Sequence, residues 1–132
     1  MQLFEAAKLQ RTDDQIASYS SKGPSAADHV IKPDLVAPGN MIIADAVPGS
    51  LLWNTAPASA KVKRNVYEYT TSTAFTSDYI RLSGTSMASP MVAGAAALLL
   101  QKDPRATPDT VKARLMKTAR KTFPTQSTDL TD

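Results

Sequence analysis

The sequence has no cysteine and a single histidine in 132 residues. Without cysteine the chain has no disulfide bond, no thiolate nucleophile and no cysteine-based zinc site. Long apolar runs are also missing, because the most apolar stretch, residues 91–100, is shorter than the roughly 20 residues that a membrane-spanning helix needs. Residues 1–7 have neither a basic start nor an apolar core, so we predict no signal peptide in this chain and no membrane partner.

What is present is the composition of a folded protein. Hydrophobic residues make up 42% of the chain and charged residues 20%, which argues against intrinsic disorder. A chain of this length is expected to form one domain and to bury roughly two-thirds of its unfolded surface. The net charge of +3 is too small to indicate nucleic-acid binding by itself.

The densest charge cluster lies in residues 102–121, which hold seven basic and two acidic side chains. A solvated helix face explains this cluster, and no aromatic side chains accompany it as a stacking platform for single-stranded nucleic acid. We therefore predict no nucleic-acid partner, and a salt-sensitive shift of DNA would be needed to revive that function. The basic residues are Lys102, Arg105, Lys112, Arg114, Lys117, Arg120 and Lys121.

Short apolar runs between proline and glycine predict β-strands in the first part of the chain. Residues 50–78 differ, since they are rich in serine, threonine, alanine and asparagine. This composition predicts a long surface insertion. A hairpin is one form considered for it, with an exposed strand at 66–70. The polar residues 123–132 predict a frayed tail. The other predicted strands are 16–19, 35–37, 41–44 and 79–82.

Two helices are predicted in the second half of the chain. The first, residues 86–101, is apolar on all sides and is therefore expected to be buried, and Asp103-Pro104 ends it. The second begins clearly, with Thr107 as the N-cap and Pro108 as the first helical residue.

The chemistry-bearing motif is Gly84-Thr85-Ser86-Met87-Ala88-Ser89-Pro90. A serine hydroxyl becomes a nucleophile when it is exposed, has a base to take its proton and has donors for the oxyanion. Here Ser86 is expected at a helix N-terminus, where free backbone N–H groups favour negative charge. Pro90 is expected in the first turn, where its missing N–H costs nothing. Ala88 excludes the α/β-hydrolase elbow, which needs glycine there.

Residues 84–98, GTSMASPMVAGAAAL, resemble the nucleophile motif and following helix of the subtilase family. Three further blocks resemble that family in the same order: IASYSSKGP at 16–24, KPDLVAPG at 32–39 and TPDTVKARL at 107–115. The resemblance implies an α/β fold, as part of a subtilisin-like three-layer αβα domain with a mostly parallel sheet. It implies that residues 1–132 form a single partial domain, the C-terminal portion of a serine endopeptidase. Ser86 is then the catalytic serine, with Gly84 and Thr85 in the nucleophile loop that supplies backbone oxyanion donors.

The remaining catalytic motifs of that family lie N-terminal to these blocks. The chain contains neither the aspartate, the histidine nor the oxyanion asparagine motif, so we predict that it is inactive alone. His29, the one histidine, lies in a variable link and is interpreted as a solvated loop residue rather than a base. Asp34 is interpreted as forming an Asx-type hydrogen bond near the Pro-Gly turn. The alternative function is a non-catalytic truncated fragment with a structural or self-associating role.

The resemblance also fixes expectations for cofactors, partners and location. Family members often bind calcium, but no carboxylates here have calcium-loop spacing, so neither a metal nor a cofactor is predicted. The expected partners are a polypeptide substrate, through the full-length enzyme, and the N-terminal part of the domain or a second copy. Such association follows because cutting a sheet exposes an edge and apolar helix faces. The parent protein is expected to be secreted.

Overall fold

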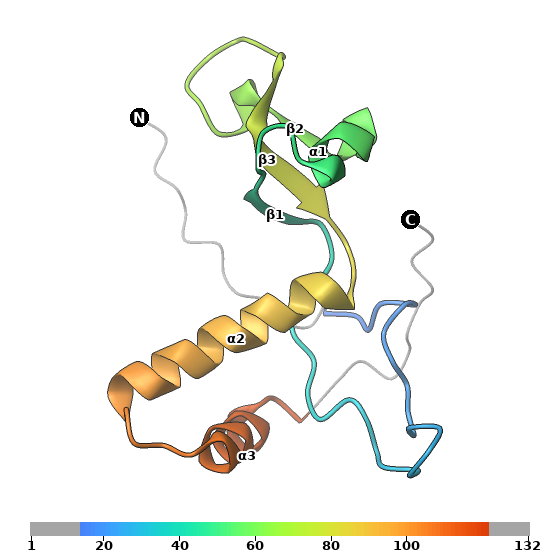
Figure 1. Ribbon diagram of the computed structural model, residues 1–132, viewed down its shortest axis with the longest axis vertical. Coiled ribbons are helices and arrows are strands. Elements are labelled where there is room, and N and C mark those ends of the chain that lie inside the picture. The colour runs from blue at the N-terminus through green and yellow to red at the C-terminus, as the bar shows by residue number, and fades with distance from the viewer. Residues whose placement is uncertain (1–13, 122–132) are drawn as a thin grey trace.

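The structure, a computed structural model, describes residues 14–121 (Figure 1). The frayed tail predicted at 123–132 lies outside the described residues. The helices and strands are β1 (Ile42–Asp45), α1 (Leu51–Thr55), β2 (Lys61–Lys63), β3 (Phe75–Leu82), α2 (Thr85–Lys102) and α3 (Pro108–Thr118), with short 3-10 turns at Ala58–Ala60 and Arg64–Val66. In Figure 1 the small sheet and α1 lie on one side of α2, and α3 lies on the opposite side of α2.

The three strands form one antiparallel sheet in the order β1-β3-β2. Ile42 pairs with Leu82 at one end of the β1–β3 ladder, and Lys61 pairs with Ile80 between β2 and β3. The fold is α/β, but within residues 14–121 the sheet contains no parallel pair. A parallel pair usually needs a crossover helix that packs across the sheet, whereas the link from β1 to β3 contains only the five-residue α1, two short 3-10 turns and β2.

Two of the predicted strands are present and three are not. Residues 41–44 and 79–82 fall on β1 and β3. Residues 16–19 instead enter a turn closed by the Ser20 N–H to the Ala17 carbonyl, and neither 35–37 nor 66–70 is a strand. An extended segment becomes a strand only when a neighbour pairs with its backbone, and these segments have no such neighbour among the residues described.

The segment 50–78, predicted as a surface insertion, contains α1, β2 and the start of β3. The side chain of Ser50 caps α1 by accepting from the Trp53 N–H, and the Lys61 ammonium lies 4.8 Å from the centre of the Trp53 ring. Val62 in β2 is 2% exposed and Ile80 in β3 is 3% exposed. These two are the most buried hydrophobic side chains in the described part, so the insertion contributes directly to the core.

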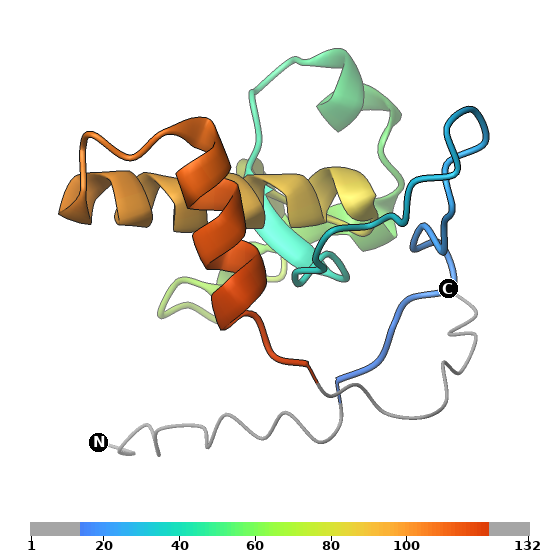
Figure 2. The ribbon, with the colours of Figure 1, turned by 90° about the horizontal axis from the view of Figure 1, so that it is seen from below.

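The sequence predicts that helix α2 is buried, and in this chain that prediction is wrong. None of its residues is buried, and Met91, Leu98 and Leu100 are 42%, 69% and 40% exposed. The reason is that α3 and the loop before β1 cover only part of its circumference, as Figures 1 and 2 show. The predicted stop is present, because Asp103 ends the helix and its N–H bonds to the Leu99 carbonyl.

Helix α3 begins as predicted. The Thr107 hydroxyl accepts from the Thr110 N–H, and Pro108 is the first helical residue. The helix crosses α2 (Figure 2), and Val111 in α3 is a buried side chain. An open groove of about 940 Å³ remains there, lined largely by apolar side chains that include Leu35, Val92, Ala96, Leu100, Val111 and Leu115.

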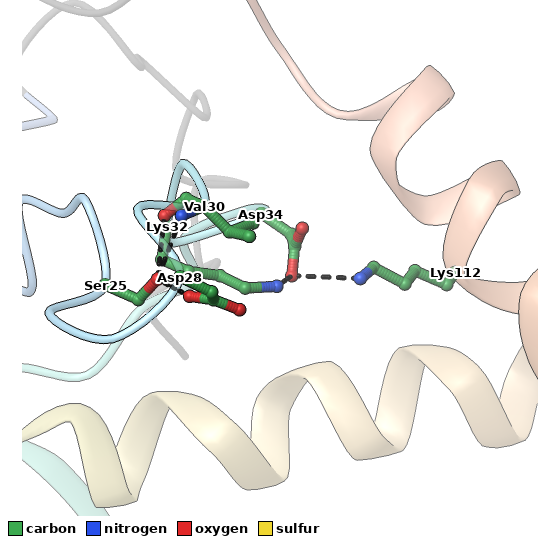
Figure 3. Close-up of polar contacts among 6 residues, drawn as sticks. All are labelled: Ser25, Asp28, Val30, Lys32, Asp34 and Lys112. Carbon is green, nitrogen blue, oxygen red and sulfur yellow. Dashed lines mark hydrogen bonds and ion pairs between the residues drawn. The ribbon is translucent and has the colours of Figure 1, made fainter.

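An ion-pair cluster ties the loop before β1 to α3 (Figure 3). Asp34 Oδ2 lies 2.6 Å from Lys32 Nζ and 3.1 Å from Lys112 Nζ. Hydrogen bonds from Lys32 and then Lys112 hold the pKa of Asp34 below its usual value, and Asp34 raises the pKa of Lys32. The predicted Asx-type hydrogen bond of Asp34 is replaced by these charge contacts.

The basic cluster at 102–121 is partly neutralised by the fold. Lys112 pairs with Asp34, and Arg114 lies 3.0 Å from Asp103. The Lys121 ammonium donates to the Met116 carbonyl near the end of α3. Acidic side chains therefore compete with any outside anion for part of this surface. Separately, none of the helices in the described part is long and apolar enough to cross a bilayer.

Candidate active site

Ser86 is the second residue of α2, directly behind the turn that leaves β3. Its side chain is exposed, and within residues 14–121 its hydroxyl makes no hydrogen bond. The N-cap of α2 is Gly84 rather than a serine, and no side chain caps the helix. Ser86 is therefore not a capping residue, and its hydroxyl is available to react with an incoming group.

The turn at Gly84 leaves two backbone donors beside that hydroxyl. The N–H groups of Met87 and Ala88 bond to the Gly84 carbonyl. Those of Thr85 and Ser86 precede the helical ladder, and no acceptor in the described part of the chain reaches them. Since the first amides of a helix point outward with partial positive charge, they favour an anion next to Ser86.

Gly84 has a backbone conformation that only glycine adopts readily. Its φ of 151° and ψ of 166° lie in a region closed to residues with a Cβ atom. A Cβ would nevertheless fit without a clash, because it would make only ordinary van der Waals contacts, the nearest with Met87 Sδ at 3.7 Å. Glycine is thus required here for its backbone angles. These angles turn the chain from β3 into α2 and so determine the position of Ser86.

A second loop packs against this turn, and the sequence did not reveal that contact. The Gly84 N–H donates to the Gly39 carbonyl at 2.8 Å, which also accepts from the Tyr19 hydroxyl at 3.3 Å. A Cβ on Gly39 would lie 2.8 Å from the Gly84 oxygen and 2.9 Å from the Ala88 Cβ. The motif at 32–39 predicts a strand and a tight turn, whereas in the structure its last glycine provides close approach to the nucleophile turn.

The position of Pro90 differs from the prediction. Because α2 starts at Thr85, Pro90 is its sixth residue and lies inside the helix. An ordinary residue there would donate its N–H to the Ser86 carbonyl, four residues earlier. Proline cannot do so, and the Ser86 carbonyl therefore lacks its helical donor. The missing N–H thus has a cost at this position, whereas it would have none in the first turn.

His29 lies in an exposed turn that is held by its own neighbours. The His29 N–H bonds to the Ser25 carbonyl at 3.1 Å, and the Ser25 hydroxyl donates to Asp28, which lowers the pKa of that carboxyl (Figure 3). In residues 14–121, no hydrogen bond joins the His29 ring to Ser86 or to Asp28. Gly84, Thr85 and Ser86 lie together at the start of α2, and within residues 14–121 no histidine or carboxylate side chain forms a hydrogen bond with the Ser86 hydroxyl.

Ser86 lines neither of two grooves found beside α2. The larger is the apolar groove between α2 and α3, and the smaller lies between Val36 and Ala119. Both are lined by side chains on the flank of α2 away from its first turn, so they are not a substrate cleft for Ser86. Across the described residues, no three histidine or acidic side chains gather in a way that could hold a metal ion.

Comparison with known proteins places these features in a family. Residues 6–131 match the family model described as the subtilase family. The chain is 42% identical over 103 residues to the serine protease AprX of Bacillus subtilis (strain 168), an alignment covering 78% of this chain and 20% of that protein. It is 36% identical over 109 residues to the subtilisin-like protease SBT1.7 of Arabidopsis thaliana, covering 82% of this chain and 12% of that protein. It is also 38% identical over 112 residues to SBT2.3 of the same plant, covering 80% and 11%.

The chain therefore spans a fifth or less of the length of these curated relatives. No solved structure matches the chain significantly.

Proposed function

Because this chain belongs to the subtilase family, we propose that it supplies the nucleophile of a serine endopeptidase, with Ser86 as the attacking residue. The observation that carries this proposal is the exposed Ser86 hydroxyl, free of any partner in the described part, at the N-terminus of α2 behind the Gly84 turn. The substrate class is a polypeptide, and the reaction is acyl transfer to Ser86 followed by hydrolysis.

In this reaction the Ser86 oxygen attacks the peptide carbonyl and a tetrahedral oxyanion forms. The Ser86 N–H at the start of α2 is positioned to donate to that oxyanion, with the positive end of the helix behind it. Removing one oxyanion donor typically costs a serine protease about 10²–10³ in kcat. The Thr85 N–H beside it is a further donor without an acceptor among residues 14–121, and we propose that the base and the side-chain oxyanion donor come from the rest of the catalytic domain.

We propose that the isolated chain is inactive for this reason. The base that takes the serine proton and the acid that orients the base are absent from its motifs. A broken triad leaves about 10³–10⁴ over the uncatalysed rate, and even that remainder depends on the rest of the oxyanion hole and on substrate binding. The polypeptide that supplies these groups would be the N-terminal part of the same catalytic domain, in a secreted parent protein.

The same partner accounts for the exposed surface of α2. Met91, Leu98 and Leu100 are apolar side chains in contact with water, and burying an exposed leucine fully stabilises a protein by about 1.5–3 kcal/mol. We propose that the complete domain covers them with further sheet strands, mostly parallel, in a three-layer αβα arrangement.

A graft tests the function directly. Residues 14–121 replace the matching segment of AprX, and the hybrid is treated with a fluorophosphonate probe, which labels activated serines. We expect labelling at Ser86 in the hybrid, none in the Ser86→Ala hybrid and none in the isolated chain. A hybrid that folds but is not labelled would favour the alternative, a non-catalytic fragment in which Ser86 has no chemical role.

A further inference from the structure

The residue before the Gly84 turn makes two hydrogen bonds that reach back across the fold. Ser83 Oγ accepts from the Met41 N–H at 2.9 Å and donates to Asn40 Oδ1 at 2.7 Å. Together with the bond from the Gly84 N–H to the Gly39 carbonyl, these contacts join residues 39–41 to residues 83–84. We call this set of three hydrogen bonds the serine clasp.

The clasp holds a residue with an unusual backbone. Met41 has a φ of 56°, in the left-handed region that is uncommon for residues other than glycine. Such conformations cost of order 1–3 kcal/mol and persist only where surrounding contacts impose them. The contact that fixes the Met41 N–H is the Ser83 hydroxyl. A side chain at the nucleophile turn thus helps to maintain the strained backbone of the neighbouring loop.

The sheet explains why these residues meet. Met41 directly precedes β1 and Ser83 directly follows β3, and the first pair of the ladder joins Ile42 to Leu82. The clasp therefore extends the β1–β3 ladder by one step beyond the Ile42–Leu82 pair, with the Ser83 side chain in place of a backbone partner. A short step beyond Gly84, the chain reaches Ser86 in the first turn of α2.

From this geometry we infer that Ser83 is a positioning residue for Ser86. The Ser83 hydroxyl fixes Asn40 and Met41, the adjacent Gly39 carbonyl fixes the Gly84 N–H, and the Gly84 backbone sets where the first turn of α2 presents the nucleophile. This inference rests on the proposed function. A displacement of about 1 Å in a reacting group can cost on the order of 10²-fold in rate, so a clasp that limits such displacement acts on kcat rather than on substrate binding.

The first test uses the 132-residue chain and needs no activity. Amide hydrogen exchange is measured for Ser83→Ala, for Ser83→Thr, which keeps a hydroxyl, and for Ser59→Ala, an exposed serine whose side chain makes no hydrogen bond in the described part. Loss of one hydrogen bond predicts that the Met41 amide exchanges about 5–10-fold faster in Ser83→Ala. Ser83→Thr and Ser59→Ala are expected to exchange at the unaltered rate. An unchanged Met41 rate in Ser83→Ala would show that the clasp does not exist.

The second test uses the AprX hybrid, with the active fraction titrated by the fluorophosphonate probe. We expect Ser83→Ala to lower kcat per labelled site about tenfold with KM unchanged, and Ser83→Thr to restore it. A purely structural role would lower the labelled fraction and the urea midpoint while leaving kcat per site unchanged, and that result would overturn the inference. If the unaltered hybrid is not labelled, the proposed function fails and the catalytic role of Ser83 fails with it, whereas the exchange result still decides whether the clasp exists.

Discussion

The Gly84 N–H donates a 2.8 Å hydrogen bond to the carbonyl oxygen of Gly39, and this contact brings the backbones of two glycines together at the start of α2. They are glycines for different reasons. Gly84 is needed for its backbone angles, since a Cβ there would make only ordinary contacts, whereas Gly39 is needed because a Cβ would clash with the Gly84 oxygen and the Ala88 methyl group. The two requirements lead to separate predictions.

Gly84→Ala is expected to lower the free energy of unfolding by about 1–3 kcal/mol, the usual cost of an L-residue in a region restricted to glycine. Urea unfolding of the chain measures the change. Gly94→Ala is the matched control, since Gly94 lies inside α2 and an added methyl group there would meet nothing within 4 Å. It is expected to stabilise the chain by about 0.5–1 kcal/mol. Equal effects at both positions would contradict a special backbone at Gly84.

Gly39→Ala is expected to destabilise the chain by about 1–3 kcal/mol, since the added methyl group is forced against neighbouring atoms. Ala88→Gly removes one of those neighbours but weakens α2 by about 1 kcal/mol. The double variant should therefore be more stable than the sum of the single changes predicts, by at least about 0.5 kcal/mol. Strict additivity in the urea titrations would mean that these two residues do not touch.

The sequence predicted the second half of the fold better than the first. Thr107, Pro108 and Asp103 define helix ends through local hydrogen bonding, and such local signals do not depend on the rest of the domain. Strands depend on a partner, so the apolar run at 35–37 could not be assigned correctly without knowing what lies beside it. The prediction that α2 is buried was wrong for the same reason. An apolar helix sequence does not show whether the residues that would pack against it belong to the same chain.

At the candidate site, the motif located Ser86 but not the residues that hold it. Gly39, Asn40 and Ser83 meet only through the β1–β3 pairing, which brings distant segments together. No spacing rule in one sequence reports that contact. Pro90 was expected in the first turn, whereas counting from the Gly84 N-cap that the structure shows puts it in the second turn.

Asp34→Asn is expected to lower the urea midpoint at pH 7, because Lys32 and Lys112 lose their shared carboxylate. The folded pKa of Asp34 lies below its ordinary value of 3.8. Its stabilising effect is therefore complete above that value and is lost as the pH falls through the lower folded pKa. The difference between the variant and the unaltered chain should thus disappear in strong acid and shrink in high salt.

Lys112→Gln and Lys117→Gln separate the ion pair from the general charge of α3. Both remove one positive charge from the same helix, but of the two only Lys112 contacts Asp34. We expect Lys112→Gln to lower the urea midpoint at pH 7 more than Lys117→Gln does. Equal shifts would show that the loop at 32–34 is not held to α3 by this pair.

The apolar side chains on α2 predict association of the isolated chain. Leu98→Lys is expected to shift the concentration-dependent sedimentation of the chain toward the monomer, because it replaces a leucine that is 69% exposed with a charge. Gln101→Lys adds the same charge to the same helix without removing apolar area, and it should change association less. Sedimentation that stays monomeric at all concentrations in the unaltered chain would contradict the prediction.

Trp53, the single tryptophan of the sequence, lies under the Lys61 ammonium at the sheet end of the molecule. Its fluorescence therefore reports on α1 and β2 alone, whereas far-ultraviolet circular dichroism is dominated by α2 and α3. The fluorescence thus reports on the part of the chain before the Gly84 turn, and the circular dichroism reports mainly on the part after it. If both change at one urea concentration, the small sheet and the helix pair unfold as a single cooperative unit. If they change separately, the turn that carries Ser86 is the boundary between two independently melting halves.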